Sequence, residues 1–178
     1  MHLVHDWQGN PLVLQPDTFW HLTTPNGFFQ NNARVNKGIV LSISAAAQIP
    51  GLENAVSPYS LARANDPKEV IWETVRTQIK PALPSRLKSF YCFDSEELAE
   101  RARREWFQGA PNRLMLRIRL AHTAIVHRCD AELLNAVQNK WSENAVQYWE
   151  GKMTAAPFPE TLVHGAIYAV DWEQFPIG

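Results

Sequence analysis

The segment of residues 113–120, RLMLRIRL, alternates strictly between two kinds of side chain. Every second residue is Leu or Ile, at Leu114, Leu116, Ile118 and Leu120. The residues between them are Arg113, Met115, Arg117 and Arg119. Because successive side chains of a β-strand point to opposite faces of a sheet, this pattern predicts a strand with one apolar face. For Arg117 and Arg119 we expect a solvated sheet face, with contact to an acidic or nucleic-acid acceptor as the alternative.

Further strands and helices are indicated by composition and by turn-forming residues. The predicted strands are 19–24 (FWHLTT), 39–44 (IVLSIS), 87–93 (LKSFYCF) and 161–172 (TLVHGAIYAVDW), the last being one strand or a strand pair with a bulge at Gly165. Helices are predicted to begin at Asp66 and Asp94 and to cover 130–139 and 142–150, and residues 25–38 are predicted to form a long loop. Strands crowd both ends of the chain and helices lie between them, which favours an α+β fold with a substantially antiparallel sheet.

Two of the helix starts carry explicit capping signals. Asp66 precedes Pro67, which suits an N-cap followed by proline in the first turn, and Asp94 with Glu97 resembles a capping box. The expected apolar faces are Ile71, Val75 and Ile79 in the first of these helices and Leu98, Ala102 and Trp106 in the second.

Length and charge limit the kind of protein this can be. The chain has 178 residues, 46% of them hydrophobic, which suits one compact domain covering residues 1–178. Its 17 basic and 18 acidic residues nearly cancel, so there is no general basic field of the kind that drives non-specific nucleic-acid binding. No stretch reaches the length of a membrane span, and the amino terminus lacks the pattern of a signal peptide, so we expect a cytoplasmic protein without a membrane partner.

Several common site chemistries have no motif in this chain. Cys92 and Cys129 lie far apart and form no metal-ligand pattern, and we expect His122 and His127 to be surface residues without metal, so no metal cofactor is predicted. The chain also has no GxGxxG, no GxxxxGK[ST] and no GxSxG segment. Any nucleotide site must therefore be of another kind.

Three segments taken together resemble a known family. FWHLTT carries His21 followed two residues later by Thr23, KSFYCFDSEELAERA carries Tyr91 in a strand followed by a helix, and YWEGKMTAAPFPETLVHGAIYAV carries Glu160 at the start of a late strand. In this order and spacing they resemble the three motifs of the H-Y-E branch of the ADP-ribosyltransferase superfamily, the branch of diphtheria toxin and the poly(ADP-ribose) polymerases. The resemblance implies a split antiparallel sheet with flanking helices.

The resemblance also implies an activity and roles for these residues. It implies an NAD-dependent mono-ADP-ribosyltransferase in which Glu160 is catalytic, His21 and Thr23 hold the ribose side of NAD, and Tyr91 stacks on nicotinamide. NAD is then the co-substrate, and a macromolecule (protein, DNA or RNA) is the acceptor. A toxin, a phage-related effector and a housekeeping modifier would all fit this description.

The chemistry of NAD cleavage suits these residue types. The bond between nicotinamide and ribose breaks through an oxocarbenium-like state, and because the leaving group departs neutral it needs no general acid. One carboxylate near the ribose can stabilise the developing positive charge and orient the acceptor, as we expect of Glu160. A neutral imidazole can accept a hydrogen bond from a ribose hydroxyl, as we expect of His21.

Two further residues are candidates for cofactor binding, and several activities remain open. Arg86 can grip the pyrophosphate with two hydrogen bonds or be an exposed turn residue, and Tyr59 can line a pocket or belong to a simple connection. The alternatives to a transferase are an NAD glycohydrolase, an RNA 2'-phosphotransferase-like enzyme, and a catalytically silent module of the same fold that binds a nucleotide or a protein.

Overall fold

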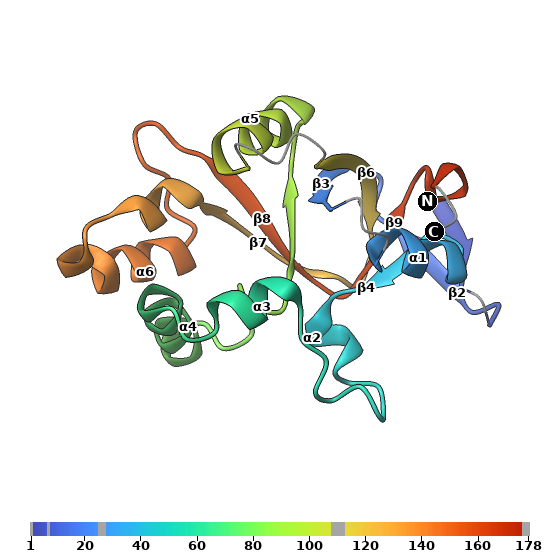
Figure 1. The fold of residues 1–178 in the computed structure, drawn as a ribbon, viewed down its shortest axis with the longest axis horizontal. Coiled ribbons are helices and arrows are strands. Elements are labelled where there is room, and N and C mark those ends of the chain that lie inside the picture. Colours follow the sequence, from blue (N-terminus) through green and yellow to red (C-terminus); the bar gives the residue numbers. More distant parts are fainter. Residues whose placement is uncertain (1, 7, 25–27, 108–112, 176–178) are drawn as a thin grey trace. The chain divides into compact units, whose positions relative to one another are not determined.

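The computed structural model describes residues 2–6, 8–24, 28–107 and 113–175, and Figure 1 shows its fold. Helices and antiparallel strands alternate irregularly along the chain, which confirms the predicted α+β class. The chain divides into two compact units: a first unit of residues 1–41, 91–124 and 165–178, and a second unit of residues 42–90 and 125–164. The expectation of one domain stays a prediction, and each unit is described by itself.

The first unit is built on an antiparallel sheet. Its strands, in the order of hydrogen-bonded neighbours, are β4 (Ile39–Leu41), β9 (Ala166–Ala169), β6 (Leu114–Leu120), β3 (Phe19–Thr23) and β5 (Phe90–Phe93). A hairpin of β1 (His2–His5) and β2 (Pro11–Leu14) belongs to the same unit and was not predicted. The alternating segment forms β6 as predicted, with Ile118 and Leu120 fully buried and Arg117 exposed.

Two helices and one 3-10 helix complete the first unit. They are α1 (Phe28–Val35), which packs on β4, α5 (Glu96–Trp106), which packs on β3, and η3 (Trp172–Gln174). The N-cap of α5 is Ser95, whose hydroxyl accepts from the backbone of Leu98, so the prediction of Asp94 as the cap is wrong by one residue. Ser95 is the N-cap because its extended backbone places the hydroxyl over the first turn of the helix.

The prediction of a long loop over residues 25–38 is wrong for 28–35, which form α1, and residues 25–27 lie outside the described residues. Phe29 and Ala33 lie one turn apart and are both buried, so tertiary burial overrides the weak helix propensity of the asparagines. The helix is followed by Lys37 and Gly38 with positive φ, and Gly38 donates to the Ala33 carbonyl. A side chain at Gly38 would meet Tyr168 and Trp172 at 2.5 Å, so glycine is required there.

The second unit pairs two antiparallel strands with a group of helices. The strands are β7 (Ile125–Asp130), which was not predicted, and β8 (Pro159–His164). The helical elements are α2 (Ile43–Ala46), α3 (Pro58–Arg63), α4 (Pro67–Ile79), α6 (Trp141–Trp149), η1 (Ala131–Asn135) and η2 (Gln138–Lys140). Helices α4 and α6 lie side by side (Figure 1). The strand predicted over 39–44 ends at Leu41, because Ser42 caps α2.

Aromatic side chains form the core of the second unit. Trp72 from α4, Tyr148 and Trp149 from α6, and Phe158 before β8 are all at most 1% exposed. Helix α4 begins with the predicted Asp66 cap, but its buried residues are Glu69 and Trp72, whereas Ile79 is 40% exposed. The expected face is thus half-buried at Ile71 and Val75 and exposed at Ile79, because the helix turns the larger Trp72 inward.

Two negative findings concern the described part of the chain. None of its helices combines the length and the apolar composition that crossing a membrane requires. Among the same residues there is no group of three or more histidine, cysteine or acidic side chains arranged to hold a metal ion.

Candidate functional site

His21 lies in the middle of β3 with strands on both sides. Its backbone pairs with Cys92 of β5 and with Leu116 of β6. The ring nitrogen Nδ1 lies 2.8 Å from the backbone carbonyl oxygen of Tyr91. Because a carbonyl oxygen only accepts hydrogen bonds, Nδ1 carries the proton and donates it, and Nε2 is the acceptor nitrogen of the neutral ring.

The surroundings of His21 favour its neutral form. Burial lowers the pKa of His21 below its ordinary value of 6.5, the hydrogen bond to Tyr91 opposes this shift, and the charge of Arg113 adds to it. The ring of Phe29 from α1 lies against the imidazole, with 5.0 Å between ring centroids and a 33° angle between the planes. The imidazole is thus oriented by a backbone carbonyl on one strand and by an aromatic ring on a helix.

The other two residues expected near nicotinamide and ribose are also in the first unit. Tyr91 begins the part of β5 that belongs to this unit, and its side chain is partly exposed. Thr23 ends β3, pairs with Leu114 and is partly exposed. The structure therefore brings His21 and Tyr91 into contact through the Tyr91 carbonyl, and places Thr23 at the end of the same strand as His21.

A cluster of charged and phenolic side chains lies inside the second unit. Arg86 is 5% exposed and forms ion pairs with Glu69 of α4 and Glu160 of β8, which are 4% and 2% exposed. Tyr59 and Tyr148 complete the group, which we call the Arg86 cluster. Three of the predicted site residues, Tyr59, Arg86 and Glu160, therefore meet in one place.

The hydrogen bonds of Arg86 account for all five of its N–H groups. Nε donates to Glu69, Nη1 donates to the Tyr148 hydroxyl and to Glu160 Oε1, and Nη2 donates to the Tyr59 hydroxyl and to Glu69 Oε1. Its guanidinium carbon also lies 5.2 Å from the centroid of the Tyr148 ring. In this arrangement Arg86 holds two carboxylates, and its contact with a pyrophosphate stays a prediction. The alternative of an exposed turn arginine is wrong.

The two carboxylates of the cluster differ in how fully they are bonded. Both oxygens of Glu69 accept hydrogen bonds, Oε1 from Tyr59 at 2.6 Å and Oε2 from Arg86 at 3.1 Å. Glu160 accepts through Oε1 only, from Arg86 at 2.8 Å and from Tyr148 at 2.7 Å. Its Oε2 makes no hydrogen bond with the described residues.

Glu160 Oε2 nevertheless keeps contact with solvent. In the described part of the chain, the buried side-chain atoms without a hydrogen bond are Gln30 Oε1, Trp72 Nε1 and Arg119 Nε. Since Glu160 Oε2 is not among them, the small exposure of this residue includes that oxygen. Glu160 thus uses one carboxylate oxygen inside the cluster, and the 2% of the residue that remains exposed includes part of the other.

Local structure holds Glu160 at this position. The residue pairs with Cys129 of β7. At the end of β7, the fully buried Asp130 accepts from the backbone of Thr154 and of Phe158, each at 2.8 Å. These bonds hold the segment that precedes β8 against the end of β7. The position of Glu160 is therefore fixed by this anchor and by the pairing of β8 with β7.

The neighbouring thiol and phenol groups are kept in their protonated forms. Burial raises the pKa of Tyr59 above its ordinary value of 10.0, with the charge of Glu69 adding to the shift and that of Arg86 opposing it. Burial raises the pKa of Cys129 well above 9.0, and the nearby Glu160 adds to this. Tyr59 therefore acts as a hydrogen-bond donor to Glu69, and Cys129 is not a nucleophile.

Sequence reasoning did not find the roles of Glu69, Tyr148 and His127. Glu69 lies three residues before Trp72 on the same helix face, and a glutamate on the face of a buried tryptophan signals a buried cation elsewhere. His127 is 8% exposed in β7, stacks on Trp149 at 5.4 Å between centroids, and places Nε2 2.9 Å from the Tyr148 carbonyl. The prediction of a surface histidine failed because β7 itself was not predicted.

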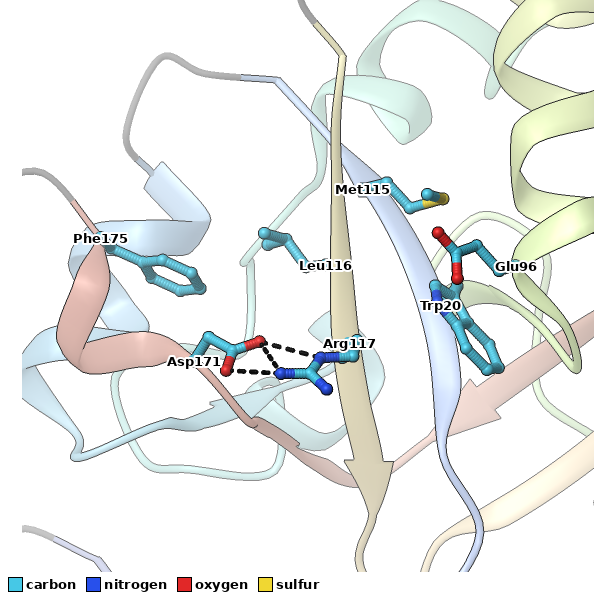
Figure 2. A pocket seen from close by; sticks show the side chains of 7 residues that line it. All are labelled: Trp20, Glu96, Met115, Leu116, Arg117, Asp171 and Phe175. Atoms are coloured by element: carbon cyan, nitrogen blue, oxygen red, sulfur yellow. Dashed lines mark hydrogen bonds and ion pairs between the residues drawn. The ribbon is translucent and has the colours of Figure 1, made fainter.

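The first unit also contains a hollow of about 240 Å³ beside β3 and β6. Its described lining residues are Trp20, Glu96, Met115, Leu116, Arg117, Asp171 and Phe175. Figure 2 shows the Arg117 guanidinium turned toward Asp171, with which it forms hydrogen bonds of 2.8–3.1 Å. The hollow is smaller than the roughly 300–1,000 Å³ of typical ligand pockets, so it cannot enclose a whole dinucleotide.

Comparison with known proteins identifies a family. None of the curated proteins matches the chain. A family model matches residues 29–174, a range that includes Tyr59, Arg86, Tyr91 and Glu160 but begins after His21 and Thr23. Since the model covers most of the 178 residues, the chain belongs to the family described as "Protein of unknown function (DUF2441)".

Proposed function

We propose that this protein is an NAD-dependent mono-ADP-ribosyltransferase with an ADP-ribosyltransferase-like split sheet. In this proposal it cleaves the bond between nicotinamide and ribose and transfers ADP-ribose to a protein or nucleic-acid acceptor. NAD is the co-substrate, and the reaction needs no metal. Glu160 is the catalytic carboxylate, His21 and Thr23 hold the ribose, and Tyr91 stacks on nicotinamide.

The observation that carries the proposal is the state of His21. A ribose hydroxyl can donate to an imidazole only if one ring nitrogen is unprotonated, and burial favours that neutral form. The Tyr91 carbonyl fixes which nitrogen this is, because it takes the Nδ1 proton and makes Nε2 the acceptor. The histidine is therefore neutral, oriented and carried by a central strand, as a group that positions a sugar needs to be.

In the proposal, Glu160 supplies the carboxylate that the same chemistry needs. In the proposed reaction its carboxylate stabilises the positive charge that grows on the ribose as nicotinamide departs. Glu160 is 2% exposed, so solvent screens its interactions less than those of a surface carboxylate. Its Oε2 has no hydrogen-bond partner among the described residues, and this atom is the one we assign to the substrate.

A second candidate function is favoured by the same burial. A carboxylate that is 2% exposed and bonded to Arg86 and Tyr148 also suits a purely structural ion pair. The protein would then be a catalytically silent module that binds a nucleotide or a protein. The two functions differ in turnover, since only the enzyme releases nicotinamide from NAD.

The test of the proposal uses His21→Asn with His122→Asn as its matched control. Asparagine keeps a donor for the Tyr91 carbonyl but has no atom at the Nε2 position, and His122 is an exposed histidine in the same unit. Nicotinamide release from NAD would be measured with cell lysate as the acceptor source. We expect release by the wild type and by His122→Asn, with a loss of about tenfold or more in His21→Asn.

The outcomes separate the candidate functions. Labelled NAD would then show whether ADP-ribose is transferred to a macromolecule or released to water, which distinguishes the transferase from a glycohydrolase. Binding of NAD without any release by the folded wild type would favour the silent module. Equal activity of His21→Asn and His122→Asn would remove the proposed role of the imidazole.

A further inference from the structure

We propose that Arg86 and Tyr148 are positioning residues for Glu160: they hold its Oε1 so that Oε2 alone is presented to the substrate. The inference rests on the proposed function, because it assigns how the catalytic carboxylate of that reaction is oriented. Neither residue is assigned to contact NAD or the reacting atoms.

The cluster contains an internal comparison that supports this reading. Arg86 lies between two tyrosine–glutamate pairs, Tyr59 with Glu69 and Tyr148 with Glu160. In each pair the phenol donates to a carboxylate Oε1 and accepts from a terminal nitrogen of Arg86. The pairs are thus alike in residue type, in donor and in the cation they share.

The pairs differ in the second carboxylate oxygen. Arg86 donates to both oxygens of Glu69, whereas it donates only to Oε1 of Glu160. Burial of a carboxylate oxygen without a hydrogen bond is costly, so a structural ion pair normally satisfies both oxygens, as Glu69 does. Among the described residues Glu160 has no hydrogen-bond partner for Oε2 although it is only 2% exposed, and this is the arrangement expected of a carboxylate that binds a ligand.

Anchoring one oxygen also fixes the direction of the other. A carboxylate held by a single donor can rotate about its last side-chain bond, whereas two donors that converge on Oε1 from Arg86 and Tyr148 restrict that rotation. Such preorganisation lowers the cost of reaching the reactive geometry without changing how tightly the rest of the substrate binds. Glu69, held on both oxygens, in turn fixes Arg86.

The experiment compares Tyr148→Phe with Tyr59→Phe. Each variant removes one hydroxyl that donates to a glutamate Oε1 and accepts from Arg86, and each keeps the aromatic ring. Steady-state nicotinamide release would give kcat and KM for NAD, and thermal unfolding would report folding. We expect Tyr148→Phe to lower kcat about tenfold or more, with KM changed by less than about twofold. Tyr59→Phe should lower kcat by less, because it leaves both hydrogen bonds to Glu160 Oε1 in place.

Thermal unfolding separates positioning from support of the fold. Since both variants lose equivalent bonds, a purely structural role predicts similar losses of stability and similar kinetics. Equal kcat values in the two variants, or a Tyr148→Phe effect confined to KM, would overturn the inference while leaving the proposed function in place. Absence of nicotinamide release from the folded wild type would instead overturn the proposed function and this inference with it.

Discussion

The half-buried His21 in the first unit and the buried Arg86 cluster in the second satisfy their polar groups in opposite ways. His21 is kept neutral and has a backbone carbonyl as its hydrogen-bond partner. The Arg86 cluster buries a guanidinium and two carboxyl groups whose partners are other side chains. The surroundings of His21 therefore avoid a charge on the imidazole. In the Arg86 cluster, buried charges of opposite sign lie next to each other.

The comparison teaches which parts of a site a sequence can reveal. The partner of His21 comes from regular strand pairing, which follows from recognisable strands. The partners of Arg86 lie 17, 62 and 74 residues away in Glu69, Tyr148 and Glu160, on separate elements, and no local pattern connects them. A backbone partner is predictable once the strand is, whereas a side-chain network appears only when the elements are packed.

The largest difference between the regions should appear when the cation of the cluster is removed. Arg86→Met leaves two buried carboxyl groups without their cation, so we expect the free energy of unfolding to fall by about 3–5 kcal/mol. The control is Arg117→Met in the first unit, which breaks the ion pair of Arg117 with Asp171. The side chains of these two residues are 56% and 33% exposed. That change should cost at most about 1 kcal/mol. Urea denaturation measures both, and similar losses in the two variants would contradict the account.

Acid should probe the neutral histidines, because the unfolded chain binds protons that the folded chain excludes. The pKa of His21 is lowered by burial, so below about pH 6.5 the unfolded state takes up a proton before the folded state does. The free energy of unfolding therefore falls as the pH drops below that value, by up to about 1.4 kcal/mol per pH unit for one such histidine.

His21→Asn sharpens this prediction. The variant should lose part of the pH dependence and not all of it, because burial also lowers the pKa of His127 in the second unit. Urea denaturation between pH 7 and pH 5 gives the slopes, and a slope that His21→Asn does not change would show that the imidazole is not held neutral.

The smallest effects should be the same in both units, because helix capping is local. The hydroxyls of Ser95 and Ser57 accept from the backbone at the starts of α5 and α3. Replacement of either serine by alanine should lower the free energy of unfolding by about 1 kcal/mol. Circular dichroism during urea denaturation measures this, and a loss as large as that of Arg86→Met would mean that capping is not local in these units.

Much of the fold could be predicted from the sequence where the pattern was strong. The alternation of residues 113–120 predicted β6, and Asp66 predicted the start of α4. The prediction failed where tertiary burial overrides local signals, as in α1, whose Phe29 and Ala33 pack inward from an asparagine-rich segment. It also missed β7, in which the buried His127 was interpreted as a surface residue.

The candidate site could likewise be predicted only in part from the sequence. The residue positions His21, Tyr91 and Glu160 came from short motifs, and the His21–Tyr91 contact depends only on neighbouring strands. The environment of Glu160 did not follow from its own segment, because its partners Arg86 and Tyr148 come from a turn and from a helix. Burial of a charged residue depends on where its counterion is placed, and that is a property of the packed chain.

The most direct test of the account is nicotinamide release from NAD by the wild type, Glu160→Gln and Glu143→Gln. Glutamine keeps the shape of the side chain and removes its charge, and Glu143 is an exposed glutamate paired with Lys140 in the same unit. The account predicts release by the wild type and by Glu143→Gln, and a loss of at least about a hundredfold in Glu160→Gln while NAD still binds. Undiminished release by Glu160→Gln would contradict the assignment of Glu160 as the catalytic carboxylate.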